Sequence, residues 1–153
     1  FLVVATSLAA VTFVGCGGSP TLPPLPKDAP TVGPHDGPAY ALPQGLGYAE
    51  VTNEPKAGER DRTAATAIVV YFLKPDAKGA IEAAPSDVKF QVAPSGRNKA
   101  QTVALKADPR SGDPAGGGRF ASQPGPYQLE ELRGELTGKA GATPFKIEIA
   151  GAR

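Results

Sequence analysis

The stretch ATAIVVYFLK, residues 65–74, decides the fold. It is rich in β-branched and aromatic residues, which favour extended backbone. Apolar side chains occupy both alternating sets of positions, so a strand formed here would be apolar on both faces. A strand of that kind is buried on both sides. The stretch therefore predicts a central strand in a β-sheet domain.

Six further stretches have the shorter apolar–polar alternation of half-buried strands. In residues 87–92, for example, Val88, Phe90 and Val92 alternate with Lys89 and Gln91. Polar, glycine- and proline-containing segments typical of turns separate these stretches. The six are residues 47–52, 87–92, 101–106, 118–122, 132–138 and 144–150.

No segment has a sustained helical period, and residues 128–132 predict one helical turn at most. Seven short strands at this spacing are typical of an antiparallel sandwich or barrel. The sequence thus predicts an all-β fold, a single antiparallel seven-stranded β-sandwich with an immunoglobulin- or fibronectin-like arrangement. A small open barrel is the alternative.

Composition excludes several classes of protein. The 153 residues include 16 Lys and Arg against 15 Asp and Glu, which argues against a nucleic-acid-binding protein. With one cysteine, no intramolecular disulfide is possible. One cysteine and one histidine do not make a zinc site of the Cys/His kind. No acid, base and nucleophile converge in the pattern, so we expect no enzymatic activity.

The amino-terminal residues 1–14, FLVVATSLAAVTFV, carry no charge. The run is short for a membrane-spanning helix, which needs about 20 apolar residues. It has the length of the apolar core of a signal peptide. The first residue is not Met and no positive charge precedes the run, so we expect the sequence to be truncated at its amino terminus.

The sequence Phe13-Val14-Gly15-Cys16 resembles the lipobox of bacterial lipoproteins, with Phe13 in place of the usual Leu. The resemblance implies that Cys16 receives a diacylglyceryl group and becomes the first mature residue after cleavage. Two or more acyl chains give stable membrane anchoring. The alternatives are a buried free cysteine and an uncleaved membrane anchor. Gly17, where a retention signal would have Asp, favours the outer membrane by the same resemblance.

A proline-rich segment follows Cys16 and is typical of an extended, semi-rigid spacer. The predicted organisation is a truncated lipoprotein signal peptide at 1–15, the lipidated cysteine and a Pro/Gly-rich linker at 16–46, and the β-sandwich at 47–153. This layout would hold a folded head away from a bacterial membrane, facing the periplasm or the cell surface.

Two segments carry candidate metal ligands. His35 and Asp36 lie in GPHDGP, residues 33–38, and Asp108 and Asp113 each precede a proline in the loop of residues 106–120. Neighbouring side chains of an extended segment point apart and chelate poorly. The spacing of a calcium loop is also absent. We therefore favour turns in both segments. If a metal binds, these four residues are the expected ligands.

A wider resemblance rests on the lipobox, GPHDGP, VVYFLKPDAK, LKADPRSGDPAGGGRF and the closing GELTGKAGATPFKIEI. Together they are similar to small bacterial envelope lipoproteins, related to modules found with the membrane-fusion proteins of metal-efflux systems. In those modules a PHGG-like stretch precedes the β domain; here it reads Pro34-His35-Asp36-Gly37. The resemblance implies a β domain and introduces metal handling as an alternative function.

These observations favour a lipid-anchored, non-catalytic β-sandwich of the bacterial cell envelope. Its expected partners are the membrane, through the lipid on Cys16, and another envelope protein, with no nucleic acid. No cofactor is expected beyond that covalent lipid. The alternative is an accessory protein of an envelope efflux system in which His35 helps to bind a metal. An enzyme and a purely structural spacer are the remaining hypotheses.

Overall fold

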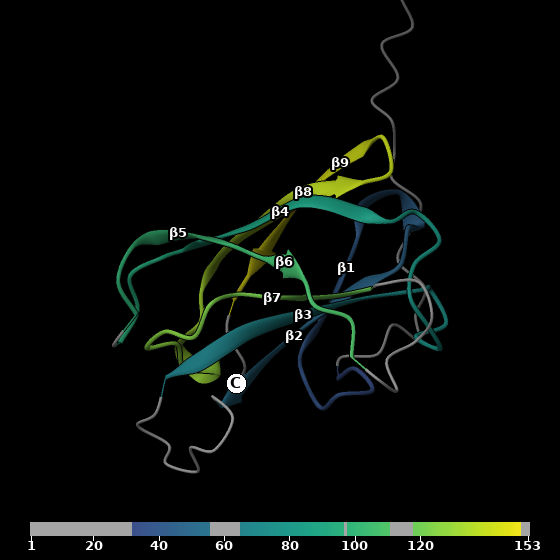
Figure 1. The fold of residues 1–153 in the computed structure, drawn as a ribbon. Helices are drawn as coiled ribbons and strands as arrows, with labels where there is room; N and C mark the ends of the chain where they lie inside the picture. Colours follow the sequence, from purple (N-terminus) through teal and green to yellow (C-terminus); the bar gives the residue numbers. More distant parts are fainter. Residues whose placement is uncertain (1–31, 56–64, 97, 111–117, 151–153) are drawn as a thin grey trace, which may run out of the picture.

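Two stacked antiparallel sheets make up the fold (Figure 1). The computed structural model describes residues 32–55, 65–96, 98–110 and 118–150. These residues form nine strands and two short 3-10 turns. No helix among them has the length and apolar character to cross a membrane. The prediction of an all-β fold is confirmed.

The larger sheet has five strands in the order β1-β2-β3-β7-β6. Their bounds are Ala39–Ala41 for β1, Tyr48–Pro55 for β2, Thr66–Leu73 for β3, Lys106–Ala107 for β6 and Arg119–Ala121 for β7. The smaller sheet has four strands in the order β5-β4-β8-β9. Their bounds are Pro85–Val92 for β4, Gln101–Ala104 for β5, Gly134–Ala140 for β8 and Thr143–Ile149 for β9. The two 3-10 turns are Pro43–Gly45 and Leu129–Glu131.

Strand β3 is central, as its two apolar faces predict. It pairs with β2 along its full length and with β7 on its other side. The side chains of Ile68, Val70 and Phe72 enter the main core between the sheets. Val69 and Leu73 point to the opposite face, where they form a second apolar cluster with Tyr48 and Tyr71. All the β3 residues from Ile68 to Leu73 are buried.

The main core is built from the inward positions of both sheets. The expected inward positions Val88, Phe90 and Val92 are buried, as are the large apolar residues of the later predicted strands: Val103, Leu105, Phe120, Leu132, Leu136, Phe145, Ile147 and Ile149. Phe72 packs edge-on against Phe120, with ring centroids 5.5 Å apart. Tyr127 is buried in the same core, on the connection between β7 and β8, and this burial raises the pKa of its hydroxyl.

The number of strands differs from the prediction. All seven expected strands form, but the segment predicted as one strand at 101–106 is divided between β5 and β6, in different sheets. The chain changes sheet at Leu105, whose side chain stays in the core. Strand β1 is additional and pairs with β2. It lies within the residues expected to be linker, so the described fold extends back to Val32, which bridges to Pro38.

Candidate functional site

Polar side chains gather on the outer face of the larger sheet, the face turned away from the main core. Glu50 of β2 is paired with Tyr71 of β3, and Tyr71 is paired with Arg119 of β7. Paired residues of adjacent strands have their side chains on one face. The three therefore form a row across the sheet. Glu50 and Arg119 are 0% and 1% exposed, although each carries a charge.

Glu50 is surrounded by hydrogen-bond donors from residues 32–38. Its Oε1 atom accepts bonds from the backbone N–H groups of His35, at 2.7 Å, and Gly37, at 2.9 Å. Its Oε2 atom lies 2.8 Å from Nδ1 of the His35 ring. A carboxylate offers only acceptors, so Nδ1 of His35 is the donor. These three bonds replace the water that a buried carboxylate gives up.

The segment folds as a tight turn closed by its own backbone. The N–H of Gly33 donates to the carbonyl of Gly37 at 2.8 Å, and the N–H of Asp36 donates to the carbonyl of Gly33 at 3.1 Å. Asp36 has a φ of 62°, in the left-handed region that Asp tolerates better than most residues. Hydrogen bonds within the turn itself therefore fix its shape, in addition to its contacts with the sheet.

Glycine is required at two positions of this turn because its backbone lies against the sheet. A Cβ atom on Gly33 would lie 2.2 Å from the carboxyl carbon of Glu50. A Cβ atom on Gly37 would lie 2.4 Å from the backbone oxygen of Val51. The first contact would displace the Glu50 carboxylate from its donors, and the second, with a backbone atom, would move the turn away from β2. The spacing of glycines around His35 is thus explained by close approach to β2.

The His35 ring stacks on the ring of Tyr71. The ring centroids are 3.6 Å apart and the planes are inclined by 6°. Together with the bond to Glu50, this contact holds the imidazole in one orientation. The His35 side chain remains 31% exposed. None of the hydrogen bonds found among the described residues uses its Nε2 atom.

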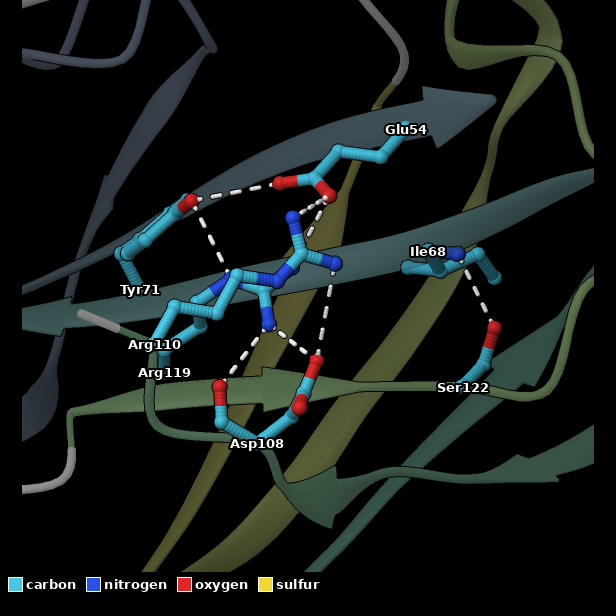
Figure 2. A network of polar contacts seen from close by, with 7 residues as sticks. All are labelled: Glu54, Ile68, Tyr71, Asp108, Arg110, Arg119 and Ser122. Atoms are coloured by element: carbon cyan, nitrogen blue, oxygen red, sulfur yellow. Dashed lines mark hydrogen bonds and ion pairs between the residues drawn. The ribbon is translucent and has the colours of Figure 1, made fainter. Parts of the chain in front are cut away.

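Arg119 lies at the other end of the row and is held by three side chains, as Figure 2 shows. Its Nε–H donates to the hydroxyl of Tyr71 at 3.2 Å. Its Nη1 donates to the backbone oxygen of Asp108 at 2.8 Å and also contacts the Asp108 carboxylate. Its Nη2 forms an ion pair with Oε2 of Glu54 at 3.0 Å.

The electrostatics of this network keep Arg119 charged. Burial by itself lowers the pKa of a guanidinium, but the bonds to Tyr71, Asp108 and Glu54 outweigh it and raise the pKa of Arg119. Arg110 adds a second cation, with Nη1 at 2.5 Å from Oε2 of Glu54. Two arginines thus face two carboxylates, which balances the charge of the network.

A separate polar contact joins Ile68, near the start of β3, to Ser122, which directly follows β7. The backbone N–H of Ile68 donates to Oγ of Ser122 at 2.9 Å (Figure 2). The Ser122 hydroxyl in turn donates to the backbone oxygen of Gln123 at 2.8 Å. The Ser122 hydroxyl is occupied by the backbone on both sides. It has the role of a structural bridge at the end of the sheet.

The predicted site residues fall into three groups. Cys16 and Asp113 lie outside the described residues. His35 and Asp36 share the turn against β2, whereas Asp108 is engaged with Arg119. Within the part of the chain that the structure describes, no three His, Cys, Asp or Glu side chains are grouped as metal ligands would be. His35 was expected in an exposed turn, but it is half-buried against Glu50 and Tyr71.

Sequence reasoning missed Glu50, Glu54, Tyr71 and Arg119 as a connected group. Glu50 interrupts an otherwise apolar strand start, and Arg119 precedes the core residue Phe120. In an alternating strand such charges are expected to face solvent. A signal was present in the neighbouring sequence, because β3 is apolar on both faces and so requires cover on the outer face.

This arrangement can hold the His35 ring in place with Nε2 as its remaining nitrogen. Carboxylate-bound histidines of this kind serve as metal ligands, with the carboxylate fixing the ring and its tautomer. The same pair can act as a proton acceptor, but that chemistry needs a nucleophile or substrate group beside Nε2.

No family model, no curated protein and no solved structure matches this chain.

The bonds around Glu50 predict a clear effect of its substitution. Glu50→Gln keeps the shape of the side chain but replaces a charged acceptor with a neutral one, and it turns an amide N–H₂ toward a donor. We expect a loss of about 1–3 kcal/mol in the free energy of unfolding. Urea denaturation measures this free energy.

Glu82→Gln is the control, because the Glu82 side chain is 88% exposed and its loss should change stability by less than about 0.5 kcal/mol. Equal effects of the two substitutions would contradict a stabilising role for Glu50.

Proposed function

We propose that this chain is a lipid-anchored, non-catalytic module of the bacterial cell envelope that binds another envelope protein. The observation that carries the proposal is the position of Cys16. It stands between an uncharged apolar run and a proline-rich segment, in a lipobox-like sequence. After that segment comes an all-β fold whose described residues begin at Val32. A tethered interaction domain has this order of parts.

The polar network of the larger sheet supports a binding role more than a catalytic one. Glu50 and Arg119 are buried, and both side chains are held by hydrogen bonds and ion pairs to groups of the same chain. The exposed members of the network are Arg110 and Asp108, whose side chains are 56% and 45% exposed. They offer a mixed-charge surface suited to a polar partner.

We further propose an immunoglobulin-like topology for the two sheets. In such domains the strands are arranged as A-B-E-D in one sheet and C-F-G in the other. The order β2-β3-β7-β6 corresponds to the first sheet, and β4-β8-β9 to the second. On this assignment β1 and β5 are additional edge strands, and β5 lies beside strand C as in fibronectin-like arrangements. The strand order is the support for this assignment.

The lipid anchor is tested by the mass of the protein from bacterial cells. We expect the native chain to begin at Cys16 and to carry a diacylglyceryl group, and to partition into the detergent phase. Cys16→Ser should abolish the lipid mass and the incorporation of labelled fatty acid, because a hydroxyl does not replace the thiol in this modification. Ser19→Ala, three residues further on, is the matched control and should be lipidated normally. An unprocessed leader or a bare thiol at Cys16 in the native protein would contradict the proposal.

Metal handling is the second candidate, favoured by the geometry of His35. Its Nδ1 is fixed by Glu50 at 2.8 Å, which orients Nε2 as a ligand atom would be oriented. Of the other proposed ligands, Asp36 is adjacent to His35 in the chain, the Asp108 carboxylate is paired with Arg119, and Asp113 lies outside the described residues. One imidazole alone binds weakly, so the site would need ligands from these residues or from a partner.

Calorimetric titration of the full chain with divalent metal ions tests this second function. If His35 is a ligand, the chain binds with about micromolar affinity and His35→Asn abolishes the heat. Asparagine is the sharper substitution, since its amide N–H₂ can replace Nδ1 as donor to Glu50 while Nε2 is lost. Thermal melting of the variant should therefore stay close to that of the native chain. Unchanged binding by His35→Asn would exclude His35 as a ligand.

A further inference from the structure

The smaller sheet ends in a long edge strand. β9 has seven residues and pairs with β8 on one side. Among the described residues no strand pairs with its other side. The other edge strands, β1, β5 and β6, have two to four residues. An unpaired edge of this length is a template for pairing with another chain.

The hairpin that precedes β9 fixes which backbone groups point outward. Ala140 pairs with Thr143 across a two-residue turn in which Gly141 has a φ of 60°. The closing pair of such a hairpin is hydrogen-bonded, and the bonded pairs then alternate along the ladder. The backbone groups of Phe145, Ile147 and Ile149 therefore face β8. Those of Lys146 and Glu148 face away from it.

Pro144 and Tyr40 limit this free edge at its two ends. Pro144 has no N–H and occupies an outward position, where an edge strand tolerates proline. At the other end, the hydroxyl of Tyr40 bonds to the backbone of Ala150. Between these limits, Lys146 and Glu148 each present a backbone N–H and a backbone C=O at the free edge.

The side chains along the same edge have opposite charges at those two positions. Phe145, Ile147 and Ile149 are buried in the core, whereas Lys146 and Glu148 are exposed on the outer face. The Lys146 side chain is 71% exposed, and its ammonium lies 2.5 Å from Oε2 of Glu135 on β8. On the exposed face of β9, the cation Lys146 thus precedes Ile147 and the anion Glu148 follows it.

We propose that β9 pairs antiparallel with β9 of a second copy of this chain, about a two-fold axis at Ile147. In this register Lys146 of each copy lies opposite Glu148 of the other. Each of the two pairs can form both of its backbone hydrogen bonds. Two cross-strand ion pairs then form on the exposed face. The sheets of the two copies become continuous through one isologous contact.

Other symmetric registers lack this complementarity. A two-fold axis at Lys146 or at Glu148 places like charges directly opposite one another, which is destabilising. A slip of one residue sets the charged positions against the buried ones, because side chains alternate between faces. Charge therefore selects a single register. This pairing requires neither the lipid anchor nor a bound metal.

Charge reversal tests the pairing directly. Lys146→Glu and Glu148→Lys each put like charges opposite one another in the symmetric dimer, so each should weaken dimerisation by about tenfold or more. An equimolar mixture of the two variants restores both opposite-charge pairs in a heterodimer. The double variant, with the charges exchanged, restores them in a homodimer. Sedimentation equilibrium of the full chain in one detergent measures all four, together with the native protein.

Two controls separate this contact from others. Lys89→Glu makes the same change of charge on the exposed face of β4 and should leave dimerisation unchanged. Thermal melting of each variant checks the fold, because Lys146→Glu also loses the contact with Glu135. Association through any other part of the chain would be equal in all variants. A native chain that stays monomeric, or variants that self-associate equally and gain nothing from mixing, would overturn the proposal.

Discussion

The fold depends on one constraint, the apolar character of β3 on both of its faces. Ile68, Val70 and Phe72 require cover on one side, and Val69, Tyr71 and Leu73 require it on the other. The second sheet covers the inner face and forms the main core with it. Among the residues that the structure describes, no third sheet lies on the outer face, and part of that face is covered instead by the turn of residues 32–38.

This constraint explains why charged side chains on the outer face are paired. Once the turn lies over β2 and β3, Glu50 has no access to water, and an unpartnered carboxylate there would cost several kcal/mol. The backbone N–H groups of His35 and Gly37 meet that need. Arg119, beside the same tyrosine, is satisfied by Asp108 and Glu54. Tyr71 connects both groups, through its ring to His35 and through its hydroxyl to Arg119.

Much of this architecture was predictable from periodicity. Alternation of side chains reports burial directly, so the seven expected strands and their inward residues are present in the structure. Strand β1 was missed because AYA is too short to show a period and is flanked by proline. The division of residues 101–106 between β5 and β6 was missed because Val103 and Leu105 are both buried, whichever sheet their neighbours join. Tertiary contacts, which alternation does not report, determine which sheet such short segments join.

The candidate site was less predictable, because it is made by residues far apart in the sequence. His35 meets Glu50 across 15 positions, and Arg119 meets Tyr71 across 48. GPHDGP has the composition of an exposed turn, and it is a turn. Nothing within it shows that its backbone lies against a carboxylate. That information resides in the packing of the turn on β2, where Gly33 and Gly37 allow close approach.

Amide hydrogen exchange along β3 tests most directly whether this strand is covered on both faces. The account predicts that residues 68–72 exchange the most slowly in the chain, at rates set by global unfolding, and far more slowly than the edge strand β5. Exchange in residues 68–72 as fast as in β5 would contradict it.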